Sequence, residues 1–79
     1  MIVVYSKPAC MQCTATTREL ERKGIPFKYV DLSEDLEAVS TIKSLGYAQV
    51  PVVVAGEQHW SGFRPDKIRT LVEAAAVAV

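Results

Sequence analysis

One stretch near the start of the chain decides the expected fold, Ile2-Val-Val-Tyr-Ser-Lys-Pro-Ala-Cys-Met-Gln-Cys13. It opens with β-branched and aromatic residues, which are typical of a strand, and Pro8 ends that strand. Residues 11–23 then favour a helix, and Gly24 stands where a C-terminal cap belongs. Both cysteines therefore lie where a strand gives way to a helix, and Ala15 and Leu20 are expected to form the buried side of that helix.

A second strand and a second helix are expected to follow. The alternating run Phe27-Lys-Tyr-Val-Asp31 is typical of a strand. Ser33 is a suitable N-cap for the next helix, and Gly46 marks its end. The expected buried face of this helix consists of apolar residues at helical spacing, namely Leu36, Val39, Ile42 and Leu45. A strand–helix–strand unit of this kind pairs its two strands in parallel through a right-handed crossover.

The last part of the chain predicts a hairpin followed by a helix. Residues 51–55 and 58–61 are typical of two antiparallel strands joined by the turn Gly56-Glu57. Pro65 suits the first position of a final helix. The apolar face expected for that helix consists of Ile68, Leu71, Val72 and Ala75. The elements together predict a mixed sheet with helices on both faces, in the α/β class, and the 79 residues are expected to form a single domain.

The composition indicates neither nucleic-acid binding nor membrane binding. Nine Lys and Arg residues balance nine Asp and Glu residues, so the formal net charge is zero. A nucleic-acid-binding surface or a polybasic membrane patch would need an excess of basic residues. The start of the chain lacks the pattern of a signal peptide, and its apolar runs are too short to cross a membrane. We therefore expect a cytoplasmic protein, in which a disulfide is transient and part of the chemistry.

The pair Cys10 and Cys13 predicts thiol–disulfide exchange. Their spacing puts both sulfurs on the same side of the helix start, where they can form a small disulfide ring. Free backbone N–H groups and the positive end of the helix dipole favour a thiolate at Cys10. We assign Cys10 as the nucleophile and Cys13, which lies deeper in the helix, as the resolving thiol. Lys7 and Thr14 are the candidates for tuning the thiolate.

Two other interpretations of the cysteines stay open. A closed zinc site takes four ligands, and the only Cys and His residues of the chain are Cys10, Cys13 and His59. We therefore assign no metal ligand. A module that shares a zinc or iron–sulfur site between two copies through Cys10 is one alternative. An interaction domain whose cysteines are incidental is the other.

Three segments resemble the NrdH redoxins, which are glutaredoxin-like hydrogen donors for ribonucleotide reductase. They are Tyr5-Ser-Lys-Pro-Ala-Cys-Met-Gln-Cys13, Gln49-Val-Pro-Val-Val-Val54 and Trp60-Ser-Gly-Phe-Arg-Pro-Asp66. The resemblance covers essentially the whole chain, with Met11 in place of the valine of the family pattern. It implies a minimal thioredoxin fold, with a four-stranded sheet of order 2-1-3-4 flanked by three helices. It also implies that Pro51 is cis and that the backbone at Val50 offers hydrogen-bonding groups to an extended substrate.

The resemblance further implies which partners the cysteines serve. No cofactor is expected to be bound, and the redox-active group is the disulfide of Cys10 and Cys13. Electrons come from thioredoxin reductase, which uses FAD and NADPH, and pass to the large subunit of class Ib ribonucleotide reductase. Glutaredoxins instead hold glutathione with a Gly-Gly turn followed by acidic residues, where this chain has a single acid, Asp66. A glutathione-dependent glutaredoxin is therefore the alternative function.

The segments around the cysteines are the expected docking surface for substrate and partners. They comprise Met11, Gln12, Val50, Pro51, Trp60, Ser61, Gly62, Phe63 and Arg64. Two of these residues have a structural alternative, because Trp60 can belong to the core and Arg64 can tether its own loop through Ser61 or Asp66. A monomer is expected, since an electron carrier must expose Cys10 to two successive partners.

Overall fold

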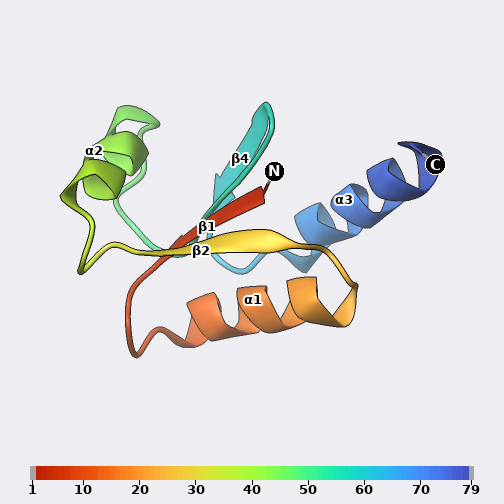
Figure 1. The fold of residues 1–79 in the computed structure, drawn as a ribbon, viewed down its shortest axis with the longest axis horizontal. Coiled ribbons are helices and arrows are strands. Elements are labelled where there is room, and N and C mark those ends of the chain that lie inside the picture. The colour runs from red at the N-terminus through yellow and green to blue at the C-terminus, as the bar shows by residue number, and fades with distance from the viewer. Residues whose placement is uncertain (1, 79) are drawn as a thin grey trace.

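The computed structural model describes residues 2–78, with side chains described for residues 2–71. The elements follow one another in the predicted order (Figure 1). They are β1 (Ile2–Ser6), α1 (Met11–Arg22), β2 (Phe27–Asp31), α2 (Leu36–Ser44), β3 (Val52–Ala55), β4 (Gln58–Ser61) and α3 (Pro65–Ala78). The predicted face residues Val72 and Ala75 lie outside the described side chains. Within residues 2–78, no helix has the length and apolar character needed to cross a membrane.

The strands form one mixed sheet of order β2-β1-β3-β4. β1 runs parallel to β2, in a register that sets Ile2 opposite Phe27. β1 and β3 are antiparallel, and so are β3 and β4. The predicted fold class and the predicted strand order are therefore confirmed.

The helices cover both faces of the sheet and bury a separate apolar cluster on each side (Figure 1). The first cluster joins the sheet to α1 and α3 and consists of Val4, Leu20, Val53, Trp60 and Ile68. The second joins the sheet to α2 and consists of Leu32, Ala38, Ile42 and Val52. Successive residues of a strand point to opposite faces. β3 therefore contributes Val53 to one cluster and Val52 to the other, as expected for a strand covered on both sides.

Helix α1 buries Leu20 as predicted, but Thr16 rather than Ala15 completes its buried side. The Thr16 hydroxyl donates to the carbonyl oxygen of Gln12 at 2.8 Å, so its polar atom is satisfied within the helix. Threonine can thus occupy a core position that the sequence pattern gave to alanine. The helix ends at Arg22 with Lys23 as its C-cap, and Gly24 follows with a φ of 68°, the left-handed conformation that suits glycine after a helix.

Helix α2 starts later than predicted, and its N-cap is Asp35 rather than Ser33. The Asp35 carboxylate accepts the N–H of Ala38 at 3.1 Å, whereas the Ser33 hydroxyl donates to Asp31 in the preceding turn. The predicted buried face is correct at Ile42, and Val39 is partly buried against the second cluster. It is wrong at Leu36 and Leu45, which are 85% and 37% exposed. Ala38 faces the sheet. Leu36 lies two positions before it, which on a helix of 3.6 residues per turn places Leu36 on the opposite, exposed side.

Candidate active site at the start of helix α1

Cys10 and Cys13 form a disulfide at the start of α1, with their Cα atoms 5.2 Å apart. Cys10 is the N-cap residue, with extended backbone angles of φ −107° and ψ 111°. Its Sγ accepts the backbone N–H of Cys13 at 3.1 Å, the bond that a serine or aspartate oxygen makes at an ordinary N-cap. The sulfur of Cys10 therefore lies at the positive end of the helix dipole, which favours negative charge there.

The two sulfurs differ in their access to solvent. The Cys10 side chain is partly exposed and lies next to Met11, which is 89% exposed. Cys13 is only 3% exposed and packs on the buried side of the helix. An incoming molecule can therefore reach Cys10 and cannot reach Cys13 without disturbing the helix. The difference fits an attacking first sulfur and a resolving second sulfur, and both roles stay predictions.

Ala9 turns the chain into the helix and was not identified from the sequence. It is the only non-glycine residue with a positive φ, 58°, among the described residues. Alanine rarely adopts this left-handed conformation, so an alanine at position 9 does not predict the turn. The turn follows the exposed residues Lys7 and Pro8 and sets Cys10 at the N-cap position.

The loop of residues 61–64 is tied to the cysteine helix and to the start of β3. The N–H of Gly62 donates to the carbonyl oxygen of Pro51 at 2.8 Å, and the N–H of Phe63 donates to Oε1 of Gln12 at 3.2 Å. The Val50–Pro51 peptide bond is cis, Pro51 is buried, and Val50 is partly buried. Three segments that are distant in the sequence thus meet beside the cysteines, and Gln12 joins two of them.

The two candidates for tuning the thiolate lie beside Cys10 in different ways. The Thr14 hydroxyl donates to the carbonyl oxygen of Cys10 at 3.2 Å rather than to a sulfur, so in this oxidised form it supports the helix. Lys7 is exposed, and within residues 2–71 it forms no ion pair and no hydrogen bond with either sulfur. The tuning roles of Lys7 and Thr14 on the thiolate therefore stay predictions.

The expected docking role of Trp60 is wrong for its indole ring, which is 4% exposed and belongs to the core. Alternation along β4 places Trp60 on the side that α1 and α3 cover. Phe63 is partly buried against the same cluster, and Ser61 and Gly62 are also partly buried. The expected docking surface therefore lacks the Trp60 ring, and the docking roles of the other residues stay predictions.

Arg64 is exposed and forms a two-point ion pair with Asp66. Its Nε lies 3.1 Å from Oδ1 of Asp66, and its Nη2 lies 2.9 Å from Oδ2. The hydrogen bonds from Arg64, together with its charge, hold the pKa of Asp66 below its ordinary value. The internal tether that the sequence left as an alternative is therefore present. Nη1 of Arg64 takes no part in it, and a docking role of Arg64 stays a prediction.

Within residues 2–71, the polar and aromatic contacts of His59 are with Tyr47 and not with the cysteine pair. Its Nδ1 lies 2.6 Å from the hydroxyl of Tyr47, and the two rings meet edge to face. Among the described residues, no group of three or more His, Cys, Asp and Glu side chains is placed to hold a metal ion. The pairing of His59 with Tyr47 was not identified from the sequence, because nothing local links residues on different elements.

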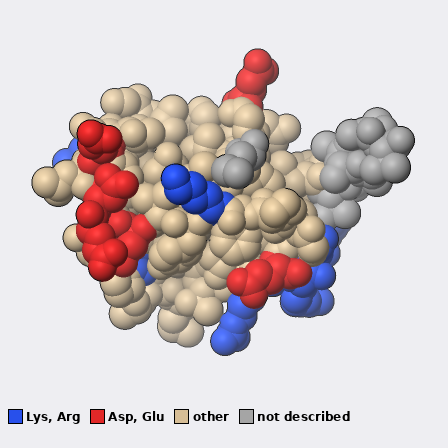
Figure 2. All heavy atoms as spheres, in the orientation of Figure 1, with Lys and Arg blue, Asp and Glu red and all other residues tan. Residues whose placement is uncertain are grey.

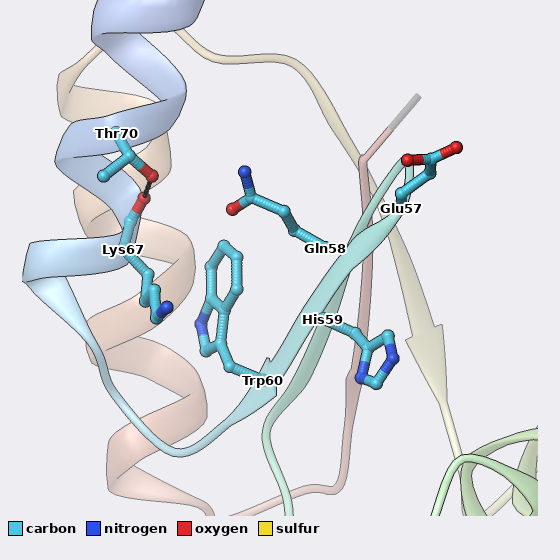
Figure 3. A pocket seen from close by; sticks show the side chains of 6 residues that line it. All are labelled: Glu57, Gln58, His59, Trp60, Lys67 and Thr70. Carbon is cyan, nitrogen blue, oxygen red and sulfur yellow. Dashed lines mark hydrogen bonds between the residues drawn. The ribbon is translucent and has the colours of Figure 1, made fainter.

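One hollow of the surface, about 400 Å³, lies between β4 and α3 (Figure 3). Figure 3 shows Gln58 and Trp60 extending from β4 towards α3, whereas His59 extends from the other side of the strand. The hollow is lined by Glu57, Gln58, His59, Trp60, Lys67 and Thr70. Because no cysteine lines it, we place the redox chemistry at a second hollow of about 360 Å³, which includes Cys10.

Comparison with known proteins identifies relatives along nearly the whole chain. The sequence model of the glutaredoxin family matches residues 2–60. The glutaredoxin-like protein NrdH of Escherichia coli K12 is 40% identical over 77 residues, which are 98% of this chain and 95% of that protein. The glutaredoxin-like protein NrdH of Lactococcus lactis subsp. cremoris is 34% identical over 71 residues, which are 90% of this chain and 99% of that protein.

A solved structure agrees with both the sequence match and the fold. The NrdH-redoxin of Escherichia coli, described as glutaredoxin-like with a thioredoxin-like activity profile, superimposes with a TM-score of 0.86 at 41% identity. The superposition covers 89% of this chain and 92% of that one. Together with the cysteine pair at the helix start, these matches show that the chain belongs to the glutaredoxin family as an NrdH redoxin, and that it is a thiol–disulfide oxidoreductase.

Proposed function

We propose that the protein is a small electron carrier that thioredoxin reductase reduces and that passes electrons to the large subunit of class Ib ribonucleotide reductase. The observation that carries the proposal is the unequal pair of sulfurs at the N-cap of α1. Cys10 is reachable and held by a backbone N–H group, whereas Cys13 is buried within bonding reach of it. Such a pair suits repeated attack on protein disulfides.

The proposed cycle starts with the reduced dithiol. The Cys10 thiolate attacks one sulfur of the target disulfide, forms a mixed disulfide and expels the other target sulfur as a thiolate, which takes up a proton. Cys13 then loses its proton and attacks the Sγ of Cys10, and the second target sulfur leaves. The target gains two electrons and two protons, and the carrier becomes the Cys10–Cys13 disulfide. Thioredoxin reductase restores the dithiol with electrons that NADPH supplies through the FAD of that enzyme.

The loop of residues 61–66 supports thioredoxin reductase rather than glutathione as the electron source. In a glutaredoxin the corresponding turn and acidic residues are expected to hold glutathione. Here the N–H groups of Gly62 and Phe63 bond to Pro51 and Gln12, and the Asp66 carboxylate is paired with Arg64. These polar groups of the loop are therefore already engaged within the protein. The thioredoxin-like activity profile described for the Escherichia coli relative points the same way.

A pair of coupled assays tests the electron source. In the first, NADPH and thioredoxin reductase are the only reductants, and oxidation of NADPH is followed as the protein reduces insulin. In the second, glutathione and glutathione reductase replace thioredoxin reductase. We expect sustained turnover in the first assay and little in the second. The reverse result would establish the glutathione-dependent alternative, and metal in freshly purified protein would favour the metal-binding alternative.

Delivery of electrons to ribonucleotide reductase needs its own assay. The class Ib enzyme is supplied with NADPH, thioredoxin reductase and this protein, and deoxyribonucleotide formation is measured. We expect product only when all components are present. Product formation at the same rate with a Cys10→Ser variant would refute the proposed role.

We also propose that residues 1–79 act as a single cytoplasmic domain and as a monomer. Support for a single domain comes from the two core clusters, which share one sheet. Sedimentation of the reduced protein at micromolar concentration tests the oligomeric state. A stable dimer that buries Cys10 would contradict the proposal.

A further inference from the structure

A groove runs from Cys10 along the exposed side of α1. Its volume is about 360 Å³, and it is lined by Ala9, Cys10, Met11, Thr14, Ala15 and Arg18. Met11, Ala15 and Arg18 follow one another at intervals of three or four residues, so they lie on the same side of the helix. The helix rises about 1.5 Å per residue, which separates the two ends of the groove by about 12 Å. An extended peptide spans that length with about four residues.

The floor of the groove near Cys10 is apolar and adaptable. Met11 is 89% exposed, the largest exposed fraction of any large apolar residue whose side chain the structure describes. Ala15, which was expected in the core, is only partly buried and leaves its methyl group beside Met11. Methionine fits side chains of different shape, because its chain is unbranched and its sulfur is polarizable. The groove next to the attacking sulfur can therefore accept an apolar side chain.

The far end of the groove carries a positive charge, Arg18, that pairs with no acidic side chain in the part of the chain whose side chains are described. Arg18 is exposed and forms no ion pair among the described residues, not even with Glu21 one turn further along. By contrast, Arg22 and Lys23 on the same helix both pair with Glu19, at 3.6 and 3.4 Å. The chain from Lys7 to Arg18 contains no acidic residue.

The two acidic residues of α1, Glu19 and Glu21, come after Arg18, and most other acidic side chains lie on other elements. In Figure 2 they gather mainly over α2 and the loop before it, on the left of the view, and the surface over the start of α1 shows none. The overall formal charge is zero, so the positive charge at the Arg18 end of the groove is a local feature. It attracts negative charge near the reacting sulfur.

We infer that this groove binds the polypeptide segment that flanks the substrate disulfide, and that the segment is acidic. An apolar side chain next to the substrate cysteine rests on Met11 and Ala15, and a carboxylate three or four residues from that cysteine pairs with Arg18. The inference rests on the proposed function, since it names the substrate class of the same site. Arg18 and Ala15 are specificity residues here, and the chemical step still belongs to the two cysteines.

The test uses three synthetic peptide disulfides with the same cysteine pair and the same leucine beside the attacked cysteine. They differ at one position three or four residues away, which carries Glu, Gln or Lys. Pre-reduced protein is mixed with each peptide, and the single-turnover rate is measured at low salt. We expect the Glu peptide to react about two- to fivefold faster than the Gln peptide, the size expected for an exposed ion pair, and the Lys peptide to react slowest.

Variants of two arginines on the same helix identify the source of this preference. Arg18→Gln removes the charge in the groove, and Arg22→Gln removes an equal charge outside it. We expect Arg18→Gln to abolish the preference for the Glu peptide, Arg22→Gln to retain it, and Arg18→Glu to reverse it towards the Lys peptide. High salt should reduce the preference of the unmodified protein.

The outcomes separate this inference from the proposed function. Equal rates for the three peptides, or equal effects of Arg18→Gln and Arg22→Gln, would overturn the acidic-substrate inference. The proposed redox role would still stand, provided that all three peptides are reduced through Cys10. If none of them is reduced, the proposed function itself fails. Thermal unfolding of each variant shows whether a change in rate reflects a loss of folded protein.

Discussion

The two sides of Cys10 differ in how the protein uses its polar groups. On one side, the loop of residues 61–64 is bonded through its backbone to Pro51 and to Gln12. On the other side, the groove along α1 ends at Arg18, which has no ion-pair partner among the described residues. The loop of residues 61–64 is held in one shape, because the N–H groups of Gly62 and Phe63 already have acceptors within the protein. The groove along α1 can bind a charged partner, because the charge of Arg18 is not neutralised by a described side chain.

The largest expected effect concerns the cysteine pair that both sides share. Cys10→Ser should abolish disulfide reduction, because the alcohol is not ionised at neutral pH and Cys13 is buried. Cys13→Ser should instead accumulate a mixed disulfide between Cys10 and the target, visible by non-reducing electrophoresis and mass spectrometry. If Cys10→Ser kept near-normal activity, the assignment of the attacking sulfur would be wrong.

The next largest effect concerns the loop of residues 61–64, and a pair of glycine substitutions tests whether its shape matters. Gly62 and Gly56 both have positive φ, 85° and 65°, so alanine at either position should cost about 1–2 kcal/mol of unfolding free energy in the αL region. A Cβ atom on Gly62 would lie 3.4 Å from Oε1 of Gln12, whereas one on Gly56 would have no neighbour within 4 Å. Urea denaturation measures the stability of both variants.

The activities of these two variants should differ although their stabilities are similar. Relaxation of the backbone at Gly62 disturbs the bonds to Pro51 and Gln12, so Gly62→Ala should slow reduction of a protein disulfide. Gly56→Ala, in the hairpin turn, should leave the rate unchanged. Equal activities would show that the shape of the loop does not matter for the reaction.

A smaller effect is expected at Gln12, which joins the loop to the cysteine helix. Gln12→Ala removes the acceptor of the Phe63 N–H and should lower the unfolding free energy by about 0.5–1 kcal/mol, the net contribution of one hydrogen bond. Gln12→Glu retains an acceptor but adds negative charge beside Cys10. It should preserve the loop, measured by amide hydrogen exchange at Phe63, while it slows the attack on disulfides. Unchanged exchange in Gln12→Ala would contradict the tether.

The smallest effect is a pH dependence from the pair of Arg64 and Asp66. The pair lowers the pKa of Asp66 from its ordinary value of 3.8 in the folded protein. The unfolded chain therefore binds the proton more readily, so the pair stabilises the fold above pH 3.8, and this contribution disappears as the pH falls through the lowered pKa. The stability difference between the unmodified protein and Asp66→Asn should be constant near neutral pH and should shrink below pH 3.8. A difference that stayed constant into that range would rule out the ion pair as its cause.

Features that depend on neighbouring residues in the sequence were predicted, and features that depend on contacts between separate segments were not. The strand before Pro8, the helix after it and the cap at Gly24 depend on neighbours along the chain, and all were predicted. Asp35 replaced Ser33 as a cap because the Ser33 hydroxyl bonded to Asp31 instead. A choice between two good caps is made by such competing contacts, which a pattern of residue types does not include.

The sequence by itself determined the order of the elements and the place of two cysteines at the start of a helix. These features arise from backbone preferences and caps that act over a few residues. Only the tertiary structure decided that Trp60 lies in the core and that Gln12 bonds to a residue 51 positions away. It also decided that Arg18, beside an apolar groove, forms no ion pair with any side chain of residues 2–71. The physical reason is that burial and long-range pairing are set by how separate elements pack together, and neighbouring residues in the sequence do not record that packing.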